Sequence, residues 1–300
     1  MDIGIGIGGQ TVEEVVAQAQ RAGAEGFASA WTANIFGLDA ITALAIAGHA
    51  VPGLHLGTAV VPTFPRHPHA MAQQAMTAWD ATGGRFTLGI GLSHQIVIET
   101  MFGLSFDKPA AHMREYLAVL LPLLRDGNVS FDGDLYRVHA PLERAGDQEG
   151  PPVLVAAMAP VMLRLAGEVA DGTLLWMTGP KTVANHVAPR IHKAAADAGR
   201  AAPQIVAALP IAVTNDIDVA KQQAASTFEI YGGLPSYRAM LDAEGAAGPA
   251  DVAIVGDEAT VAAGVQAMAD AGVTEFSASC FGDRDTIRRT TALLKELRST

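Results

Sequence analysis

The residues whose chemistry is easiest to place are Ser93 and His94, which follow Gly89-Ile90-Gly91. The glycines end an apolar run typical of a buried strand, and a strand that ends in glycine lets a flat ligand approach the backbone. Histidine titrates near neutral pH, so His94 can give or take a proton during a reaction. It can equally serve only to hydrogen-bond a ligand, and the sequence leaves both roles open.

Two turns have the chemistry of a phosphate site. In the segment 156–160, small residues precede a predicted helix that starts with proline, so the first backbone N–H groups of that helix can face an anion. The segment 176–181 adds a hydroxyl on Thr178, an open N–H at Gly179 and the charge of Lys181. Because two successive β/α turns both offer backbone N–H groups to an anion, the sequence predicts a phosphate-binding region there. Its residues are Ala157, Met158, Ala159, Met177, Thr178 and Gly179.

An alternation of short apolar runs with amphipathic helical segments must position these residues. The strand-like runs are 3–7, 26–31, 54–61, 86–90, 153–157, 173–177, 205–213 and 275–279. Several are apolar on both faces, as in a parallel sheet covered by helices. The pattern predicts an α/β fold, a single (β/α)8 TIM barrel over residues 1–300, with a doubly wound open sheet as the alternative.

Three segments interrupt the alternation. Residues 93–111 follow the fourth strand and are too many for a simple loop, so they are predicted to form a lid or wall over a site. Residues 128–138 contain the turn signal of a hairpin. A further insertion, 230–250, lies in the C-terminal third and reads as helical. Pocket walls are expected from the first and third segments. The side chains expected there are Met101, Phe102, Phe106, Tyr231 and Leu234, which suit an apolar or aromatic molecule.

The glycines near the N-terminus allow two interpretations. Gly4, Gly6 and Gly9 formally match G-x-G-x-x-G, the dinucleotide fingerprint, which should follow a full strand. Only three residues precede Gly4, so these glycines fall inside the first strand. The alternative is a glycine-rich barrel strand whose end, at Gly8, leaves room for a ligand.

Composition excludes several classes of protein. The net charge is −11 and no Lys/Arg cluster offsets it, which argues against nucleic-acid binding. No apolar run approaches the roughly 18 residues that span a membrane, and the first residues do not resemble an export signal. A single cysteine suits a reducing cytoplasm. The histidines show no metal-ligand spacing, and no serine elbow or Walker loop is present. We therefore expect a cytoplasmic protein without a metal, a nucleic-acid partner or a membrane partner.

Three segments in order resemble the luciferase-like monooxygenase family. They are Gly57-Thr58-Ala59-Val60-Val61-Pro62, then Arg66-His67-Pro68, then Gly84-Arg85 leading into Gly89-Ile90-Gly91. The resemblance covers nearly the whole chain and implies a (β/α)8 barrel that holds a flavin or deazaflavin, acts on a small molecule and forms a homodimer. In that family a non-prolyl cis peptide often backs the central ring of the cofactor. The matching bond is Ala59–Val60, and an ordinary barrel strand is the alternative.

Within the family, Trp31-Thr32-Ala33-Asn34 and Gly91-Leu92-Ser93-His94 are most similar to members that use the deazaflavin coenzyme F420. In several of these a glutamate at the position of His94 donates a proton. Many family dehydrogenases carry Asp-His where this chain has Asn34-Ile35, so the departure favours reduction of an acceptor. Asn34 can still bond the cofactor ring.

The resemblance therefore implies an F420-dependent oxidoreductase that transfers a hydride between reduced deazaflavin and a small organic acceptor with an activated C=C or C=N bond. Two alternatives are an FMN-dependent monooxygenase of the same fold and a non-catalytic flavin- or deazaflavin-binding protein. His94 is the predicted catalytic residue. The predicted cofactor-binding residues are Gly8, Asn34, Thr58, Ala59, Val60, Gly89, Gly91, Ser93, His94, Ala157, Met158, Ala159, Met177, Thr178 and Gly179.

Overall fold

Eight parallel strands close into a barrel in the computed structural model, which describes residues 1–144 and 149–298. In barrel order they are β1 (Asp2–Gly6), β2 (Ser29–Thr32), β3 (His55–Thr58), β5 (Phe86–Gly91), β8 (Val153–Ala156), β9 (Gly172–Trp176), β10 (Gln204–Val213) and β12 (Glu275–Cys280). Because β10 pairs with both β9 and β12, the sheet has no open edge. The predicted (β/α)8 barrel is confirmed, and the open doubly wound sheet is excluded.

The third barrel strand is interrupted at its C-terminal end. β3 stops at Thr58, the chain bulges at Ala59 and Val60, and β4 (Val61–Pro62) resumes the pairing with β5. The single run predicted over 54–61 is therefore split by the bulge. A short extra strand, β11 (Ile254–Gly256), pairs with the far end of β10 outside the closed ring.

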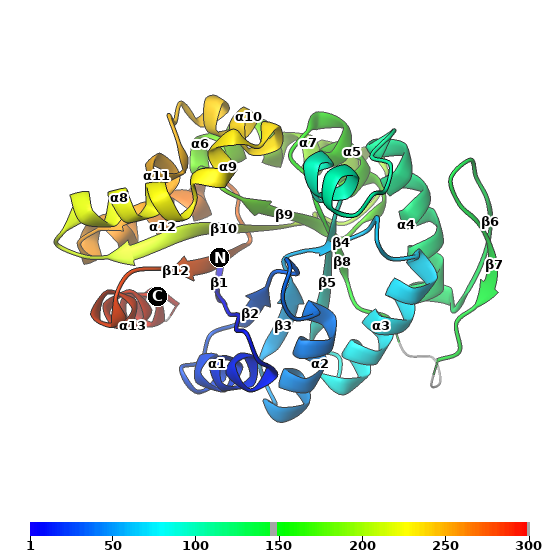
Figure 1. The fold of residues 1–300 in the computed structure, drawn as a ribbon, viewed down its shortest axis with the longest axis horizontal. Coiled ribbons are helices and arrows are strands. Elements are labelled where there is room, and N and C mark those ends of the chain that lie inside the picture. Colours follow the sequence, from blue (N-terminus) through cyan, green and yellow to red (C-terminus); the bar gives the residue numbers. More distant parts are fainter. Residues whose placement is uncertain (145–148, 299–300) are drawn as a thin grey trace.

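Helices surround the strands (Figure 1). The longer ones are α1 (Val12–Ala24), α2 (Ala40–Ala50), α3 (Pro68–Ala81), α4 (Pro109–Asp126), α5 (Pro160–Val169), α7 (Ala188–Asp197), α8 (Ile217–Thr227), α10 (Pro235–Glu244), α12 (Glu258–Asp270) and α13 (Arg284–Arg298). Several begin where a side chain caps them: the Thr11 hydroxyl accepts from the Glu14 N–H, and Asp39 and Asp257 cap α2 and α12 in the same way.

All three predicted interruptions are present. The segment after β5 contains a π-helix, η1 (Ile96–Met101), and runs on to the start of α4. A hairpin of β6 (Asn128–Asp132) and β7 (Arg137–Pro141) follows α4 and projects from the barrel in Figure 1. The C-terminal insertion forms α9 (Glu229–Gly233) and α10, followed by α11 (Pro249–Val252). Short helices also follow β9, namely α6 (Pro180–Thr182) and the π-helix η2 (Val183–Val187).

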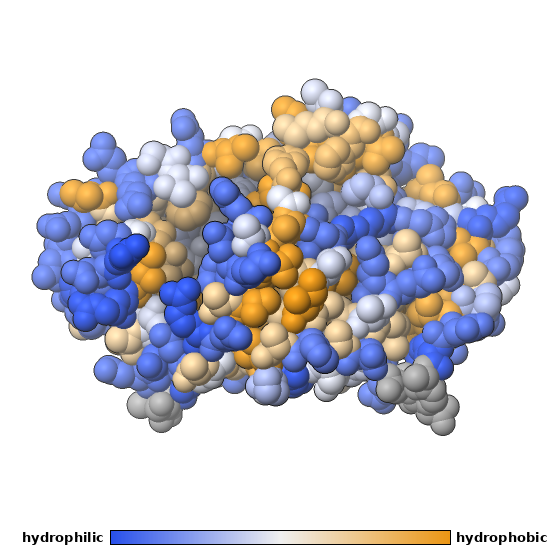
Figure 2. Space-filling model, turned by 60° about the horizontal axis from the view of Figure 1, so that its bottom comes forward, coloured by the Kyte–Doolittle hydropathy of each residue, from blue (hydrophilic) through white to orange (hydrophobic). Residues whose placement is uncertain are grey.

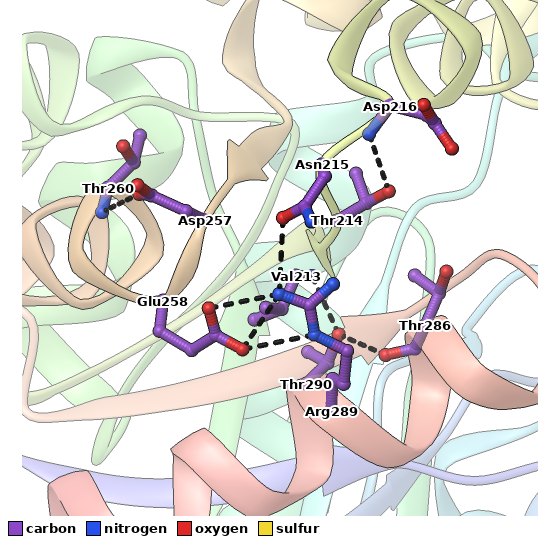
Figure 3. A network of polar contacts seen from close by, with 10 residues as sticks. All are labelled: Val213, Thr214, Asn215, Asp216, Asp257, Glu258, Thr260, Thr286, Arg289 and Thr290. Carbon is purple, nitrogen blue, oxygen red and sulfur yellow. Dashed lines mark hydrogen bonds and ion pairs between the residues drawn. The ribbon is translucent and has the colours of Figure 1, made fainter.

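Polar contacts join the elements of the last β/α units, β10, α12 and α13 (Figure 3). Arg289 of α13 donates to both carboxylate oxygens of Glu258, the first residue of α12. On the same helix the Thr290 hydroxyl accepts from the backbone N–H of Val213, at 2.8 Å, where β10 ends. Because these contacts join two helices to one strand, they fix the segment that closes the barrel.

Candidate functional site

A cavity of about 590 Å³ opens at the carboxyl ends of the barrel strands. This volume lies within the roughly 300–1,000 Å³ of small-molecule sites. Its lining comes from β1, β2, the Ala59–Val60 bulge, the segment after β5, β9, β10, β12 and the α9–α10 insertion. None of the described residues that line it is Lys, Arg, Asp or Glu. The cavity therefore suits uncharged, largely apolar parts of a ligand.

One wall of the cavity is the bulge, in which the Ala59–Val60 peptide bond is cis. Neighbouring backbone groups hold it: the Ala59 N–H donates to the Thr32 carbonyl and the Asn34 N–H to the Val60 carbonyl. From behind, the buried Thr58 hydroxyl donates to the Gly89 carbonyl and accepts from the Gly89 N–H, both at 2.8 Å. Thr58 and Gly89 thus support the bulge from the side of β5.

We expect Gly89→Ala to destabilise the fold. A Cβ at Gly89 would lie 1.9 Å from the backbone oxygen of Thr58 and 2.4 Å from a methyl carbon of Leu174, so the strands would have to separate. Overpacking of this kind costs about 1–3 kcal/mol or more. The free energy of unfolding in urea measures the effect. Gly8→Ala is the matched control, because a Cβ at Gly8 meets nothing within 4 Å, and equal stability of the two variants would contradict the prediction.

Ser93 and His94 stand where β5 ends, and both line the cavity. Ser93 has a φ of 62°, a conformation that is uncommon outside glycine and clusters at functional sites. The His94 carbonyl accepts from the Val97 and Ile98 N–H groups, which fixes its backbone at the start of η1. Its half-buried ring has no hydrogen bond to any described residue, and burial lowers its pKa from the ordinary value. The ring is therefore available to a ligand.

Aromatic side chains from the C-terminal insertion form the opposite wall. The ring of Tyr237 on α10 lies 5.5 Å from that of His94, measured between centroids. Tyr231 meets Tyr237 edge to face at 5.2 Å and Trp176 at 5.7 Å. Phe228 also meets Trp176 edge to face, at 5.8 Å. Such rings offer flat apolar surface to a ligand and partly enclose His94.

Asn34 reaches the cavity from the end of β2. Its side-chain oxygen accepts from the Ala40 N–H at 3.0 Å, at the start of α2, which orients the amide. The amide N–H groups have no partner among the described residues, so Asn34 can donate to a ligand.

The two predicted phosphate turns differ sharply. At the second, the Glu244 carboxylate of α10 accepts from the backbone N–H groups of Lys181 and Thr182 and from the Thr182 hydroxyl. A Cβ at Gly179 would lie 2.4 Å from the same carboxyl group. An anion that belongs to the protein therefore already binds the N-terminus of α6.

At the first turn, no side chain caps α5, whose N-cap residue is the exposed Ala159. The carbonyl of Met158 is within 2.7 Å of His186 Nε2 and accepts its proton, which fixes the turn. An uncapped helix N-terminus attracts anions through its N–H groups and its dipole. Of the two turns, only this one presents its N–H groups without a competing carboxylate.

The floor of the cavity lies inside the barrel. The Trp31 indole covers Gly57, where a Cβ would come within 2.2 Å of the ring, so this packing requires glycine. The Trp31 N–H donates to Glu275 at 2.5 Å and to the Ser29 hydroxyl at 2.8 Å. Burial raises the pKa of the Glu275 carboxyl.

The structure brings part of the predicted site together around the cavity. The predicted residues that line it are Asn34, Ala59, Val60, Ser93, His94 and Met158. Thr58, Gly89 and Gly91 lie buried behind the bulge, and Gly8 is hydrogen-bonded to Gln18 of α1. The others, Ala157, Ala159, Met177, Thr178 and Gly179, make up the two turns beside the cavity. Which of these residues touch a cofactor remains a prediction.

Some lining residues were missed or misplaced by the sequence. Phe102, Tyr231 and Leu234 line the cavity as expected, whereas Met101 is 59% exposed and Phe106 packs on Phe64. Trp176, Tyr237, Ser277 and Ser279 were not singled out. The signal for the serines was the alternation of Glu275, Ser277 and Ser279 along a strand, which indicates one common face.

Apolar side chains are also exposed around the mouth of the cavity. Ile35, Phe36, Phe102 and Ile230 line it and are each at least 42% exposed.

Figure 2 shows the side of the molecule that carries α1–α3, with a band of apolar residues between hydrophilic areas. Among the described residues, no helix is long and apolar enough to cross a membrane, and no three His, Cys, Asp or Glu side chains gather to hold a metal ion.

Known proteins resemble this chain in sequence and in architecture. The family profile described as luciferase-like monooxygenase matches residues 2–288. A Mycobacterium tuberculosis protein, provisionally named coenzyme F420-dependent oxidoreductase, is 32% identical over an alignment of 190 residues, which covers 57% of this chain and 52% of that protein. The chain thus spans about half the length of that relative.

Among solved structures, the F420-dependent tetrahydromethanopterin reductase of Methanopyrus kandleri superposes with a TM-score of 0.81 over 97% of this chain and 98% of that one, at 22% identity. The oxygenating component of a diketocamphane monooxygenase from Pseudomonas putida, determined with FMN, gives 0.77 over 98% and 96%, at 16% identity. Both share the barrel. Because the profile covers nearly all of the sequence, the chain belongs to the luciferase-like monooxygenase family.

Proposed function

We propose that this protein is an F420-dependent oxidoreductase that reduces a small, uncharged organic acceptor with an activated C=C or C=N bond. The observation that carries the proposal is the uncharged cavity, which joins the bulge, the unpartnered ring of His94 and an aromatic wall in one space. The relative from M. tuberculosis supports the choice of deazaflavin.

The residues present fit a deazaflavin. The Ala59–Val60 bulge and Asn34 would hold the ring system, and the uncapped N-terminus of α5 at Met158–Ala159 would hold the phosphate. When bound, reduced F420 supplies a hydride. The aromatic wall keeps water away from the reacting atoms, and His94 supplies the proton that an acceptor takes up with the hydride. The protein contributes position and electrostatics.

The residues at the end of β2 support the reductive direction of the proposed reaction. Asn34 follows β2 and lines the cavity. The next residue, Ile35, is 60% exposed and has no titratable group. A dehydrogenase needs a base to take the hydroxyl proton of its substrate, whereas a reductase needs one acid. His94 is the one histidine among the described residues that line the cavity, and no base stands at Asn34-Ile35, where many dehydrogenases of the family carry Asp-His; this departure favours reduction.

An FMN-dependent monooxygenase is the second candidate, because the FMN-bound structure of the diketocamphane monooxygenase component shares the fold. A cofactor-binding protein without turnover is the third. We also propose that the protein forms a homodimer. The apolar band on the side of the molecule that carries α1–α3 (Figure 2) is the surface that would suit such an interface.

The decisive experiment is a fluorescence titration of the purified apoprotein with F420 and, in parallel, with FMN. We expect a Kd of about 1 µM or lower for F420, near −8 kcal/mol, and much weaker binding of FMN. Reduced F420 is then mixed with 2-cyclohexen-1-one, a probe with an activated C=C bond, and its oxidation is followed by absorbance. A preference for FMN would support the monooxygenase, and tight F420 binding without oxidation by any of a panel of C=C and C=N acceptors would support the binding protein.

A further inference from the structure

The interior face of β12 carries a polar column that the proposed chemistry does not use. Glu275, Ser277 and Ser279 alternate along this strand and so share one face. Glu275 accepts from the Trp31 indole N–H inside the barrel, which shows that this face points inward. Ser277 and Ser279 line the cavity above it.

β1 presents glycines to this column: at Gly4 the side chains of Ser29 and Glu275 fill the space, whereas Gly6 lines the cavity. Gly4 pairs with Ser277 in the sheet, and Gly6 follows on the same face. A Cβ at Gly6 would meet no atom closer than 3.5 Å, so the room at this position is open. On the other side of β12, the neighbour of Ser277 is Ala208, another small residue that lines the cavity. The cavity therefore extends down into the barrel beside the two serines.

Ser277 is a buried residue whose hydroxyl has no partner among the described residues. Only 4% of the residue is exposed, yet its hydroxyl makes no hydrogen bond to any described residue. Two buried threonine hydroxyls on other barrel strands differ in this respect: Thr58 and Thr173 each donate to a backbone carbonyl at 2.8 Å. Polar groups on buried residues are normally hydrogen-bonded, so an unpartnered hydroxyl that lines a cavity is available to a ligand.

Charge limits what that group can be. No Lys or Arg is among the described residues that line the cavity, and the nearest carboxylate to the serines on this face is Glu275. An anion would lack a counter-charge and be repelled by that carboxylate. A neutral carbonyl or hydroxyl oxygen accepts hydrogen bonds from serine hydroxyls without a charge to bury.

We propose that Ser277 and Ser279 form a subsite that binds the uncharged carbonyl or hydroxyl oxygen of the substrate. The consequence for catalysis rests on the proposed function: the acceptor is a C=C bond conjugated to a carbonyl. When the hydride adds to the far carbon of that bond, the electron pair moves toward the carbonyl oxygen. Hydrogen bonds from the serines stabilise the charge there, and a proton from His94 completes the addition of two hydrogens. Reduced F420 supplies the hydride and its electron pair, and solvent returns the proton to His94.

Binding to the full-length protein without cofactor tests the subsite separately from the function. NMR titration measures the Kd of 2-cyclohexen-1-one and of 3-methylcyclohexene, in which a methyl group replaces the carbonyl oxygen. We expect Ser277→Ala to weaken binding of the ketone about 3- to 10-fold, the range of one neutral hydrogen bond, and to leave the hydrocarbon unchanged. Ser279→Ala should act in the same direction. Ser226→Ala, on the exposed side of α8, is the matched control and should change neither Kd.

Two results would overturn the subsite. One is equal affinity of wild type and Ser277→Ala for the ketone, and the other is a loss of affinity that is the same for ketone and hydrocarbon, which would indicate altered packing. A thermal unfolding curve for each variant shows that it is folded. Failure of F420 to bind would overturn the proposed function but leave this binding result intact, so the two failures can be told apart.

Discussion

Replacing His94 by alanine is expected to lower kcat for oxidation of reduced F420 by 2-cyclohexen-1-one by about 10²- to 10⁴-fold, the usual contribution of a positioned proton donor. The affinity for F420 should change little, because the bulge and the α5 turn remain in place. His94 is suited to this role by position: it stands at the end of β5, its ring faces Tyr237, and no described residue engages its nitrogens. Stopped-flow kinetics and the fluorescence titration measure the two quantities.

Glutamine at position 94 separates the two roles that the sequence left open. Glutamine can hydrogen-bond a cofactor but cannot titrate near neutral pH. If His94 donates the proton, His94→Gln should be nearly as inactive as His94→Ala while it binds F420 normally. Wild-type turnover by His94→Gln would contradict the proton-donor role. His192→Ala, on the exposed side of α7, serves as the matched control and should retain full activity.

The pH dependence of the reaction rate is an independent test of whether His94 acts as an acid or as a base. Burial lowers the pKa of His94, so its protonated form is lost at a pH below the ordinary histidine value of about 6.5. A reaction that uses the protonated ring should therefore slow as pH rises through that lowered pKa and be fastest on the acid side. The limb should disappear in His94→Gln. A rate that rises with pH in wild type would indicate that His94 acts as a base instead.

The fold was predictable because its signals are local. Each barrel strand is a short apolar run, and each helix shows its own start signal, as at Thr11. The cis peptide bond at Ala59–Val60 was expected only from the resemblance to the family, and the structure contains it. The boundary at Ala59 could not be predicted, because the strand-like pattern continues through the bulge into β4.

The contacts that were missed join residues far apart in the chain. Glu244 reaches Thr182 across 62 residues, and no local pattern reports that a carboxylate on one helix will cap another. The approach of Tyr237 to His94 likewise depends on how the C-terminal insertion folds over the barrel. Ser277 and Ser279 were visible as part of a strand. That they line a cavity depends on the pairing of β12 with β1, which places Gly4 and Gly6 beside them.

The largest consequence of the Glu244 contact concerns the cofactor phosphate. The sequence treats both turns as equivalent, whereas in the structure a carboxylate binds the N-terminus of α6 and leaves that of α5 open. A phosphate at α6 would have to displace Glu244 and its hydrogen bonds to Lys181 and Thr182. We therefore expect the phosphate of F420 to bind at Met158–Ala159.

Ala159→Asp tests this location. Aspartate at the N-cap position should accept N–H groups of the first turn and stabilise α5 by about 0.5–2 kcal/mol, so the melting temperature should stay equal or rise. The same carboxylate would repel a phosphate and compete for its donors. Affinity for F420 should fall about 10- to 100-fold, or roughly 1.4–2.7 kcal/mol. A gain in stability with a loss in binding distinguishes this outcome from damage to the fold.

Three controls make the result specific. The deazaflavin riboside, which lacks the phosphate, should bind Ala159→Asp as it binds wild type. Ala159→Asn offers a similar cap without charge and should weaken F420 binding much less than aspartate does. Glu244→Gln removes the charge at α6 and should leave the affinity for F420 unchanged. Tighter F420 binding by Glu244→Gln, together with normal binding by Ala159→Asp, would instead place the phosphate at α6, where it would take over the N–H groups that Glu244 now occupies.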